Sequence, residues 1–156
     1  MNHERGISVG TRQVALLVAQ VGLVGLMLGT LRIVVPALAE DEFGVARGSI
    51  LLLVAFVVAF GLVKAALNFV AGRWSEGAGR RRVLIVGWVS ALPIPVILYL
   101  APSWGWVVVA TVLLGINQGL CWSMTQTAKL DLTRAEERGT IMGLNEFAGY
   151  LGVALG

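Results

Sequence analysis

Long apolar runs separated by short polar connections constrain the fold of this chain more than any other feature. The runs cover residues 14–39, 49–74, 83–101, 105–128 and 139–156. An α-helix needs about 20 apolar residues to cross a hydrocarbon core roughly 30 Å thick. Of the 156 residues, 57% are hydrophobic and 13% are charged, whereas a typical soluble domain has about 25% charged residues. The sequence therefore predicts a polytopic membrane protein with about five transmembrane spans, the fifth of them incomplete at residue 156.

Each span is predicted to be helical, so the expected fold class is an all-α transmembrane helix bundle. Backbone polar groups in lipid must be paired within the segment or in a closed barrel, and barrel strands alternate polar and apolar residues. None of the five runs alternates in this way. The first run also resembles a signal peptide, because Arg5 and Arg12 precede it and Ala37-Leu38-Ala39 resembles a cleavage site. Its length exceeds the usual apolar region of about 7 to 15 residues, so an uncleaved helix is the favoured interpretation.

Basic residues predict the orientation of the spans. Nine Lys and Arg residues lie in the N-terminus, the second connection or the fourth connection. They are Arg5, Arg12, Arg73, Arg80, Arg81, Arg82, Lys129, Arg134 and Arg138. The opposite connections contain only Arg47. Because Lys and Arg accumulate in cytoplasmic loops, residues 1–13 are predicted to form a cytoplasmic tail.

Several function classes lack the residues that they require. The net charge of +3 comes from turns between spans rather than from a basic surface, so no nucleic-acid partner is expected. His3 is the only histidine, and neither a catalytic triad nor a phosphate-binding glycine loop occurs. Cys121 is interpreted as a small packing residue. We therefore expect membrane lipid as a partner, and no enzyme activity, metal or cofactor.

The second connection carries a recognisable motif. It reads Gly72-Arg-Trp-Ser-Glu-Gly-Ala-Gly-Arg-Arg-Arg82. This loop resembles the signature Gly-x-x-Ser/Ala-Asp-Arg-x-Gly-Arg-Arg/Lys of the major facilitator superfamily. The matching positions are Gly72, Ser75, Glu76, Gly79, Arg80 and Arg81. Glu76 replaces the usual Asp, and Gly77 replaces the usual Arg.

The resemblance implies a cytoplasmic gating loop formed by Gly72, Glu76, Gly79, Arg80 and Arg81. In the family, the acidic residue and the arginines form a latch that closes the cytoplasmic side in one conformational state. The two glycines of the loop, Gly77 and Gly79, are also expected to permit a tight reversal with positive φ.

Residues 117–125 and 138–150 resemble the fourth and fifth helices of a bacterial subgroup of the same family. The resemblance implies a secondary transporter in the bacterial plasma (inner) membrane that moves a small-molecule substrate by alternating access. Many drug/proton antiporters carry an arginine where this chain has Gly115, so antiport through that arginine is not implied.

The family fold has two six-helix halves, so this chain is expected to be an N-terminal portion that does not transport alone. Its expected partner is the remainder of the transporter or a second copy of the chain. The alternative is a small noncatalytic membrane protein that associates through glycine-rich helix faces.

Two charged residues, Lys64 and Glu146, lie well inside predicted spans. Intramembrane charges are usually functional or paired, so both are candidates for ion coupling. Counted from the cytoplasmic side, both lie roughly 10 to 14 Å deep at 1.5 Å per residue, which would allow an ion pair. Snorkelling to the inner interface is the alternative for Lys64, and Arg32 is expected to snorkel toward the outer acidic residues 40–42.

Polar residues in the fourth span repeat at helical spacing. Gln118, Trp122, Thr125 and Lys129 share one helical face, which Asn117 and Cys121 border. A polar face in mid-membrane must contact protein or water. The candidates for a substrate cavity are Asn117, Gln118, Trp122, Thr125 and Asn145, and interhelical hydrogen bonding is the alternative role.

Glycine pairs spaced by four residues predict close helix crossings. These pairs are Gly25 and Gly29, Gly115 and Gly119, Gly139 and Gly143, and Gly152 and Gly156. Since glycine is abundant, some of them are expected to be coincidental.

Overall fold

The computed structural model describes residues 6–7, 10–46 and 48–156 of the chain, and every long element among them is a helix. In chain order these are α1 (Thr11–Phe43), α2 (Ile50–Leu53), the π-helix η1 (Val54–Phe60), α3 (Gly61–Ala78), α4 (Arg80–Ala91), α5 (Ile94–Leu100), α6 (Trp104–Leu132), the short 3₁₀ helix η2 (Ala135–Glu137) and α7 (Arg138–Leu155). Four units are long and apolar enough to cross a membrane, namely 11–43, 50–78, 80–100 and 104–132. The predicted all-α transmembrane bundle is confirmed.

Glycine and serine determine where the first two spans end and begin. Gly44 ends α1 in the left-handed conformation, with φ 62°, which costs little without a Cβ atom. The amide of Val45 then bonds the carbonyl oxygen of Ala39 at 2.8 Å. The hydroxyl of Ser49 caps α2 by accepting the amide hydrogen of Leu52 at 3.3 Å, which satisfies an otherwise unpaired N–H.

The reversal between the second and third spans depends on one glycine. Gly79 joins α3 to α4 with φ 81°. Gly77 lies inside the last turn of α3, and among the described residues it is not one of the positive-φ positions. The expectation that both glycines adopt positive φ is therefore wrong for Gly77.

The third span is broken near its middle. Residues 92 and 93 separate α4 from α5, because Pro93 has no amide hydrogen to continue the helical ladder. The amide of Leu92 bonds the carbonyl oxygen of Val89 at 3.3 Å, and Ile97 restarts the pattern by bonding Pro93 at 2.8 Å.

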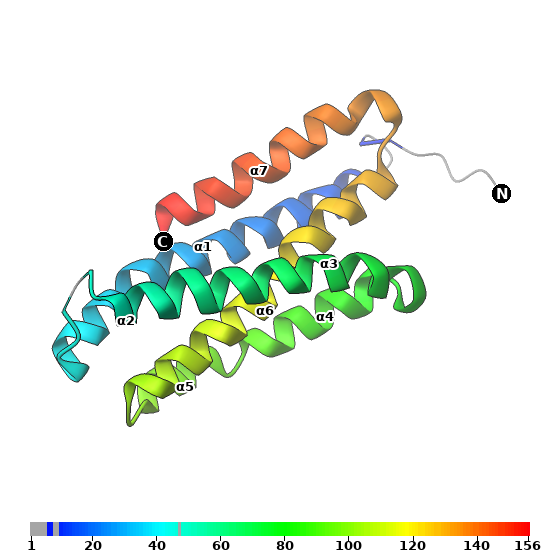
Figure 1. The fold of residues 1–156 in the computed structure, drawn as a ribbon. Coiled ribbons are helices and arrows are strands. Elements are labelled where there is room, and N and C mark those ends of the chain that lie inside the picture. The colour runs from blue at the N-terminus through cyan, green and yellow to red at the C-terminus, as the bar shows by residue number, and fades with distance from the viewer. Residues whose placement is uncertain (1–5, 8–9, 47) are drawn as a thin grey trace.

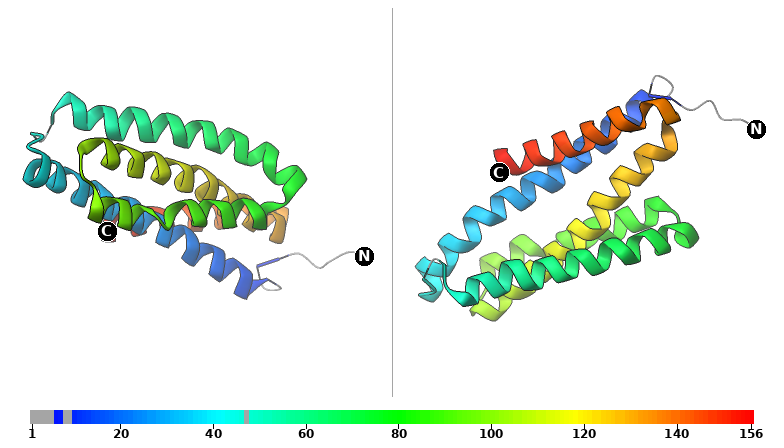
Figure 2. Two further views of the ribbon diagram at one scale, coloured as in Figure 1. Left: turned by 90° about the horizontal axis from the view of Figure 1, so that it is seen from below. Right: turned by 45° about the horizontal axis from the view of Figure 1, so that its top comes forward.

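Helix α6 is the central element of the bundle. It passes between α1 on one side and the α3–α4 pair on the other, while α7 runs alongside α1 (Figure 1). The same order is visible in the tilted view on the right of Figure 2. Of the apolar window in α6, 61% is buried, compared with 7% for the unit formed by residues 50–78. Polar groups on α6 are thus placed between helices.

The larger of the two clusters of buried apolar side chains among the described residues lies between α1, the α4–α5 unit and the first half of α6. It consists of Leu28, Leu31, Val35, Ala91, Ile94, Val107, Ala110 and Leu114. Large apolar side chains remain exposed on the other faces, including Phe69 on α3 and Tyr99 on α5. Exposed apolar faces are expected where helices contact lipid.

Helices α1 and α7 approach each other through glycines. A Cβ atom on Gly25 or Gly29 would collide with the carbonyl oxygen of Gly149 or Val153, and one on Gly152 with that of Gly22. Two of the predicted glycine pairs, those on α1 and near the end of α7, therefore mark a real close crossing.

The other two glycine pairs differ from each other. Gly115 and Gly119 on α6 pack against the η1–α3 unit, where a Cβ atom on Gly119 would lie 2.9 Å from the carbonyl oxygen of Lys64. Gly139 and Gly143 have nothing within 4 Å of such an atom. That pair is coincidental within the described structure.

The connections alternate between the two ends of the bundle. The α3–α4 and α6–α7 turns lie at the end where the chain starts, and the α1–α2 and α5–α6 turns lie at the opposite end (Figure 1). At the first end, the amide of Gly6 bonds the carbonyl oxygen of Leu132 at 2.9 Å. At the other end, the rings of Phe43 and Trp104 pack edge to face, 6.2 Å apart. Among the described residues, the start of α1 and the α3–α4 and α6–α7 turns therefore share one end, while Arg5 and Arg47 of the predicted charge pattern lie outside the described residues.

Candidate functional site

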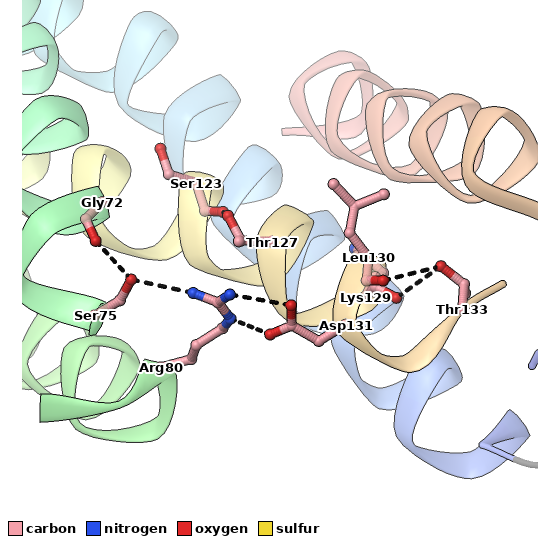
Figure 3. Close-up of polar contacts among 9 residues, drawn as sticks. All are labelled: Gly72, Ser75, Arg80, Ser123, Thr127, Lys129, Leu130, Asp131 and Thr133. Carbon is pink, nitrogen blue, oxygen red and sulfur yellow. Dashed lines mark hydrogen bonds and ion pairs between the residues drawn. The ribbon is translucent and has the colours of Figure 1, made fainter. Parts of the chain in front are cut away.

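Arg80 connects three helices at the end of the bundle that carries the basic loop. It is the first residue of α4, and its guanidinium forms two bonds with the carboxylate of Asp131 on α6, through Nε and, at 3.0 Å, through Nη2. Its Nη1 donates to Oγ of Ser75 on α3 at 3.1 Å. The Ser75 hydroxyl donates in turn to the carbonyl oxygen of Gly72 at 2.8 Å (Figure 3). The planar guanidinium suits this two-point contact with a carboxylate.

The remaining members of the predicted gating loop have less direct roles. Glu76 is exposed, and it interacts with Arg80 only electrostatically. Arg81 and Arg82 are also exposed. The principal acidic partner of Arg80 is thus Asp131, which sequence reasoning missed. The available signal was a carboxylate at the end of the fourth span, between Lys129 and Arg134 in sequence.

A second group of polar residues crosses the bundle from α3 to α7. Lys64 is the midpoint of the helical unit 50–78, and its Nζ lies 4.8 Å from the ring centroid of Trp122 on α6. The indole Nε1 of Trp122 donates to Oε1 of Glu146 on α7 at 3.3 Å. Asn145 Nδ2 donates to the same oxygen at 2.9 Å. We call Lys64, Trp122 and Glu146 the intramembrane row.

Trp122 takes the place of the direct ion pair that equal depth would have allowed. In the part of the chain that the structure describes, Lys64 and Glu146 form no salt bridge. The cation instead faces the electron-rich surface of the indole, a favourable arrangement, while the indole N–H points to the carboxylate. The ring of Trp122 therefore contacts both Lys64 and Glu146.

Glycine and tyrosine on α7 hold Trp122 in this position. A Cβ atom on Gly149 would lie 2.6 Å from the indole ring, so any larger residue there would push the ring away from α7. Tyr150 packs edge to face against Trp122, with the ring centroids 5.8 Å apart. Despite these contacts, Trp122 remains partly exposed.

Lys129 is fully buried inside the bundle. Sequence analysis counted it with the basic connection, but it belongs to α6, and its Nζ donates to the carbonyl oxygen of Leu17 on α1 at 3.3 Å. It also interacts electrostatically with Glu146. Its assignment to the basic connection is corrected, because α6 continues to Leu132. Two lysines, one on α3 and one on α6, therefore interact electrostatically with the carboxylate of Glu146.

Three of the predicted cavity residues take part in helix packing. Asn117 Nδ2 donates to the carbonyl oxygen of Gly87 on α4 at 2.9 Å, and Gln118 Nε2 donates to that of Val24 on α1 at 2.7 Å. Thr125 bonds within its own helix. All three are fully buried. The hydrogen bonds of Asn117 and Gln118 are of the kind that the interhelical alternative predicts.

Asn145 is also fully buried, but it contacts the intramembrane row through Glu146. Its Oδ1 atom, like Asn117 Oδ1 and Gln118 Oε1, has no hydrogen-bond partner. Sequence reasoning missed Asn68, whose Oδ1 accepts the hydroxyl of Ser123 at 2.6 Å. Its position four residues after Lys64 on the same helical face was the available signal.

A pocket of about 400 Å³ lies beside the intramembrane row. It is lined by Leu28, Arg32 and Pro36 of α1 and by Val57 and Phe60 of η1. Arg32 is thus part of a pocket wall, in addition to its predicted position near the outer acidic connection. Phe60 joins the pocket to the row, because Lys64 Nζ lies 5.7 Å from its ring centroid.

The described residues contain no group of three or more His, Cys, Asp and Glu side chains that could hold a metal ion. The helices and the charged groups between them define an integral membrane protein of the polytopic helical class. The family model of the Major Facilitator Superfamily matches residues 17–156, so the chain belongs to this family of transporters. No curated protein and no solved structure shows significant similarity to the chain.

Proposed function

We propose that this chain is the N-terminal part of a secondary active transporter that moves a small solute by alternating access, and that it does not transport alone. The intramembrane row carries this proposal. It sets a lysine and a carboxylate near mid-membrane on helices α3, α6 and α7, and intramembrane ionisable residues mark substrate or ion pathways. Family membership supports the transport class.

We assign the two polar groups of the chain to different tasks. The network of Arg80, Asp131 and Ser75 joins α3, α4 and α6 at one end of the bundle, so these helices would move as one body during a conformational change. The intramembrane row, together with Asn145, would contact the solute or the coupling ion. Glu146 is the group proposed to couple transport to proton movement, because it is an intramembrane carboxylate that contacts Trp122 and Asn145.

The proposed setting is the bacterial inner membrane with a cytoplasmic N-terminus. The basic residues of the α3–α4 and α6–α7 turns lie at the same end as the start of the chain, which supports this orientation. Transport takes place between two halves in the family, so the partner would be a second half from the same protein or from another copy. The glycine faces of α1 and α7 pack against each other within the chain, which supports a transporter half over an independent association module.

Proton coupling can be tested in the complete transporter. We would reconstitute it in liposomes that contain a pH-sensitive dye and screen amino acids, sugars and organic acids for a solute that moves protons. The Glu146→Gln change should reduce solute-driven proton movement at least tenfold, because the amide cannot titrate. The exposed Glu136 provides the matched control, and Glu136→Gln should leave the signal unchanged. Unchanged transport with unchanged pH dependence in Glu146→Gln would remove this residue from coupling.

A further inference from the structure

The charges around the pocket beside Arg32 do not balance. Arg32 on α1 and Lys64 on α3 are close enough to repel each other electrostatically. Glu146 on α7 interacts with Lys64 and also with the buried Lys129 on α6. Two cations, Arg32 and Lys64, therefore lie at the pocket, and the carboxylate that interacts with Lys64 is shared with Lys129.

The carboxylate of Glu146 already has hydrogen-bond donors other than Arg32 and Lys64. Glu146 Oε1 accepts hydrogen bonds from Trp122 and Asn145, and the indole separates it from Lys64. Neither Arg32 nor Lys64 has an acidic partner within an ion-pair distance among the described residues. An anion placed between them would relieve their mutual repulsion.

The pocket wall is otherwise apolar. Leu28, Pro36, Val57 and Phe60 surround the approach to Arg32, and a volume of about 400 Å³ falls in the range of small-molecule sites. One wall belongs to the π-helix η1, an irregularity that occurs frequently at functional sites. Apolar walls around a cationic end select a ligand that has an apolar body and one anionic group.

We infer that this pocket binds a small organic carboxylate, with its anionic group between Arg32 and Lys64 and its apolar body against Phe60. This inference rests on the proposed transport function and names the substrate class. Arg32 can hold the carboxylate with two parallel hydrogen bonds, while Lys64 contributes a point charge. Phe60 faces both the pocket and Lys64, so it places the body of the ligand next to the charge.

Binding can be tested without transport by titrating benzoate and its neutral isostere benzamide into the complete protein in phosphatidylcholine nanodiscs. Benzoate should bind at least tenfold more tightly than benzamide. Arg32→Gln and Lys64→Gln should each weaken benzoate binding at least tenfold and leave benzamide unchanged. Arg32→Lys, which keeps the charge, should retain the preference if Arg32→Gln fails to fold, and the exposed Arg81→Gln is the matched control. Equal affinity for benzoate and benzamide would overturn the inference.

A lipid phosphate could satisfy the same two cations, so the titration is repeated with phosphatidylglycerol in the nanodiscs. Unchanged benzoate affinity supports a soluble carboxylate, whereas a tenfold loss means that the headgroup occupies the site and overturns this assignment. The outcome is independent of proton coupling. If benzoate binds but the complete protein transports no solute, the binding site stands and the proposed function is contradicted. If the protein transports a solute but does not prefer benzoate to benzamide, the proposed function stands and the binding site is contradicted.

Discussion

Arg80 is the residue that joins three helices at the end of the bundle that carries the basic loop. Its guanidinium contacts Asp131 on α6 and Ser75 on α3 while its backbone begins α4. A lysine would keep the charge but lose the planar fork that reaches both partners. The Arg80 and Asp131 side chains are 30% and 54% exposed, so solvent screens the pair and its contribution to stability should be modest.

A double-mutant cycle can measure the coupling free energy between Arg80 and Asp131. Arg80→Gln and Asp131→Asn should couple by about 1 kcal/mol, the upper end for exposed pairs, because the contact is bidentate. The measurement is reversible unfolding of the complete protein in detergent for both single variants and the double variant. Arg81 is exposed and next to Arg80 in sequence. Arg81→Gln paired with Asp131→Asn should show a coupling near zero, and an equal coupling in both cycles would contradict the assignment.

The same residues show how far a single sequence predicts a site. Lys64 and Glu146 are visible because charges stand out in apolar runs, and Arg80 is visible because it belongs to a motif. Asp131 and the position of Trp122 between the two charges depend on how α3, α6 and α7 are rotated about their axes. Side-chain periodicity fixes which residues share a face, but it does not fix which neighbour that face meets.

At the scale of elements, glycine decides which helices can come together. The crossing of α1 and α7 places backbone against backbone at Gly25, Gly29 and Gly152. With no Cβ atoms in the way, van der Waals contact between the helices is close, and such contacts drive helix association in membranes. Gly149 has a different partner, since its missing side chain makes room for Trp122.

We predict that Gly25→Ala destabilises the protein by about 1 to 3 kcal/mol, the usual cost of overpacking. Its methyl group would collide with the carbonyl oxygen of Gly149. Gly143→Ala is the control, because nothing lies within 4 Å of its added methyl group. Alanine is the better helix former by about 1 kcal/mol, so the control should be neutral or stabilising. The readout is the free energy of unfolding, and a loss of the same size in both variants would show that the crossing is not the cause.

Element boundaries were predictable to within a few residues, because apolar runs must match the bilayer. The helices nevertheless extend beyond the runs, as α6 does by continuing to Leu132. The break at Pro93 has a visible cause in the missing amide hydrogen. The π-helix η1 has no cause that is visible in the sequence. Its segment 54–60 contains only Val, Ala and Phe, a composition that predicts an ordinary apolar helix.

At the scale of the whole molecule, the bundle is arranged around α6. This helix carries Asp131, which bonds Arg80 of the basic loop, and Trp122 of the intramembrane row. It also carries the buried Lys129, which bonds α1. Motion of α6 relative to α1 and α7 would change the contacts of Lys129 and Trp122 and would keep the contact between Arg80 and Asp131. A conformational change that opens one end of the bundle could therefore alter the charges in its middle.

The orientation of the bundle can be measured with single cysteines in the complete protein. Glu76 is exposed near the α3–α4 turn, Ser103 is exposed in the α5–α6 turn, and the two turns lie at opposite ends (Figure 1). In intact cells, a membrane-impermeant maleimide should label Ser103→Cys and should reach Glu76→Cys only after permeabilisation, because Lys and Arg accumulate in cytoplasmic loops. The parent chain is the blank, since its Cys121 is fully buried. Labelling of Glu76→Cys but not of Ser103→Cys in intact cells would invert the bundle, place Arg80 and Asp131 at the outer surface, and remove the network from any cytoplasmic gate.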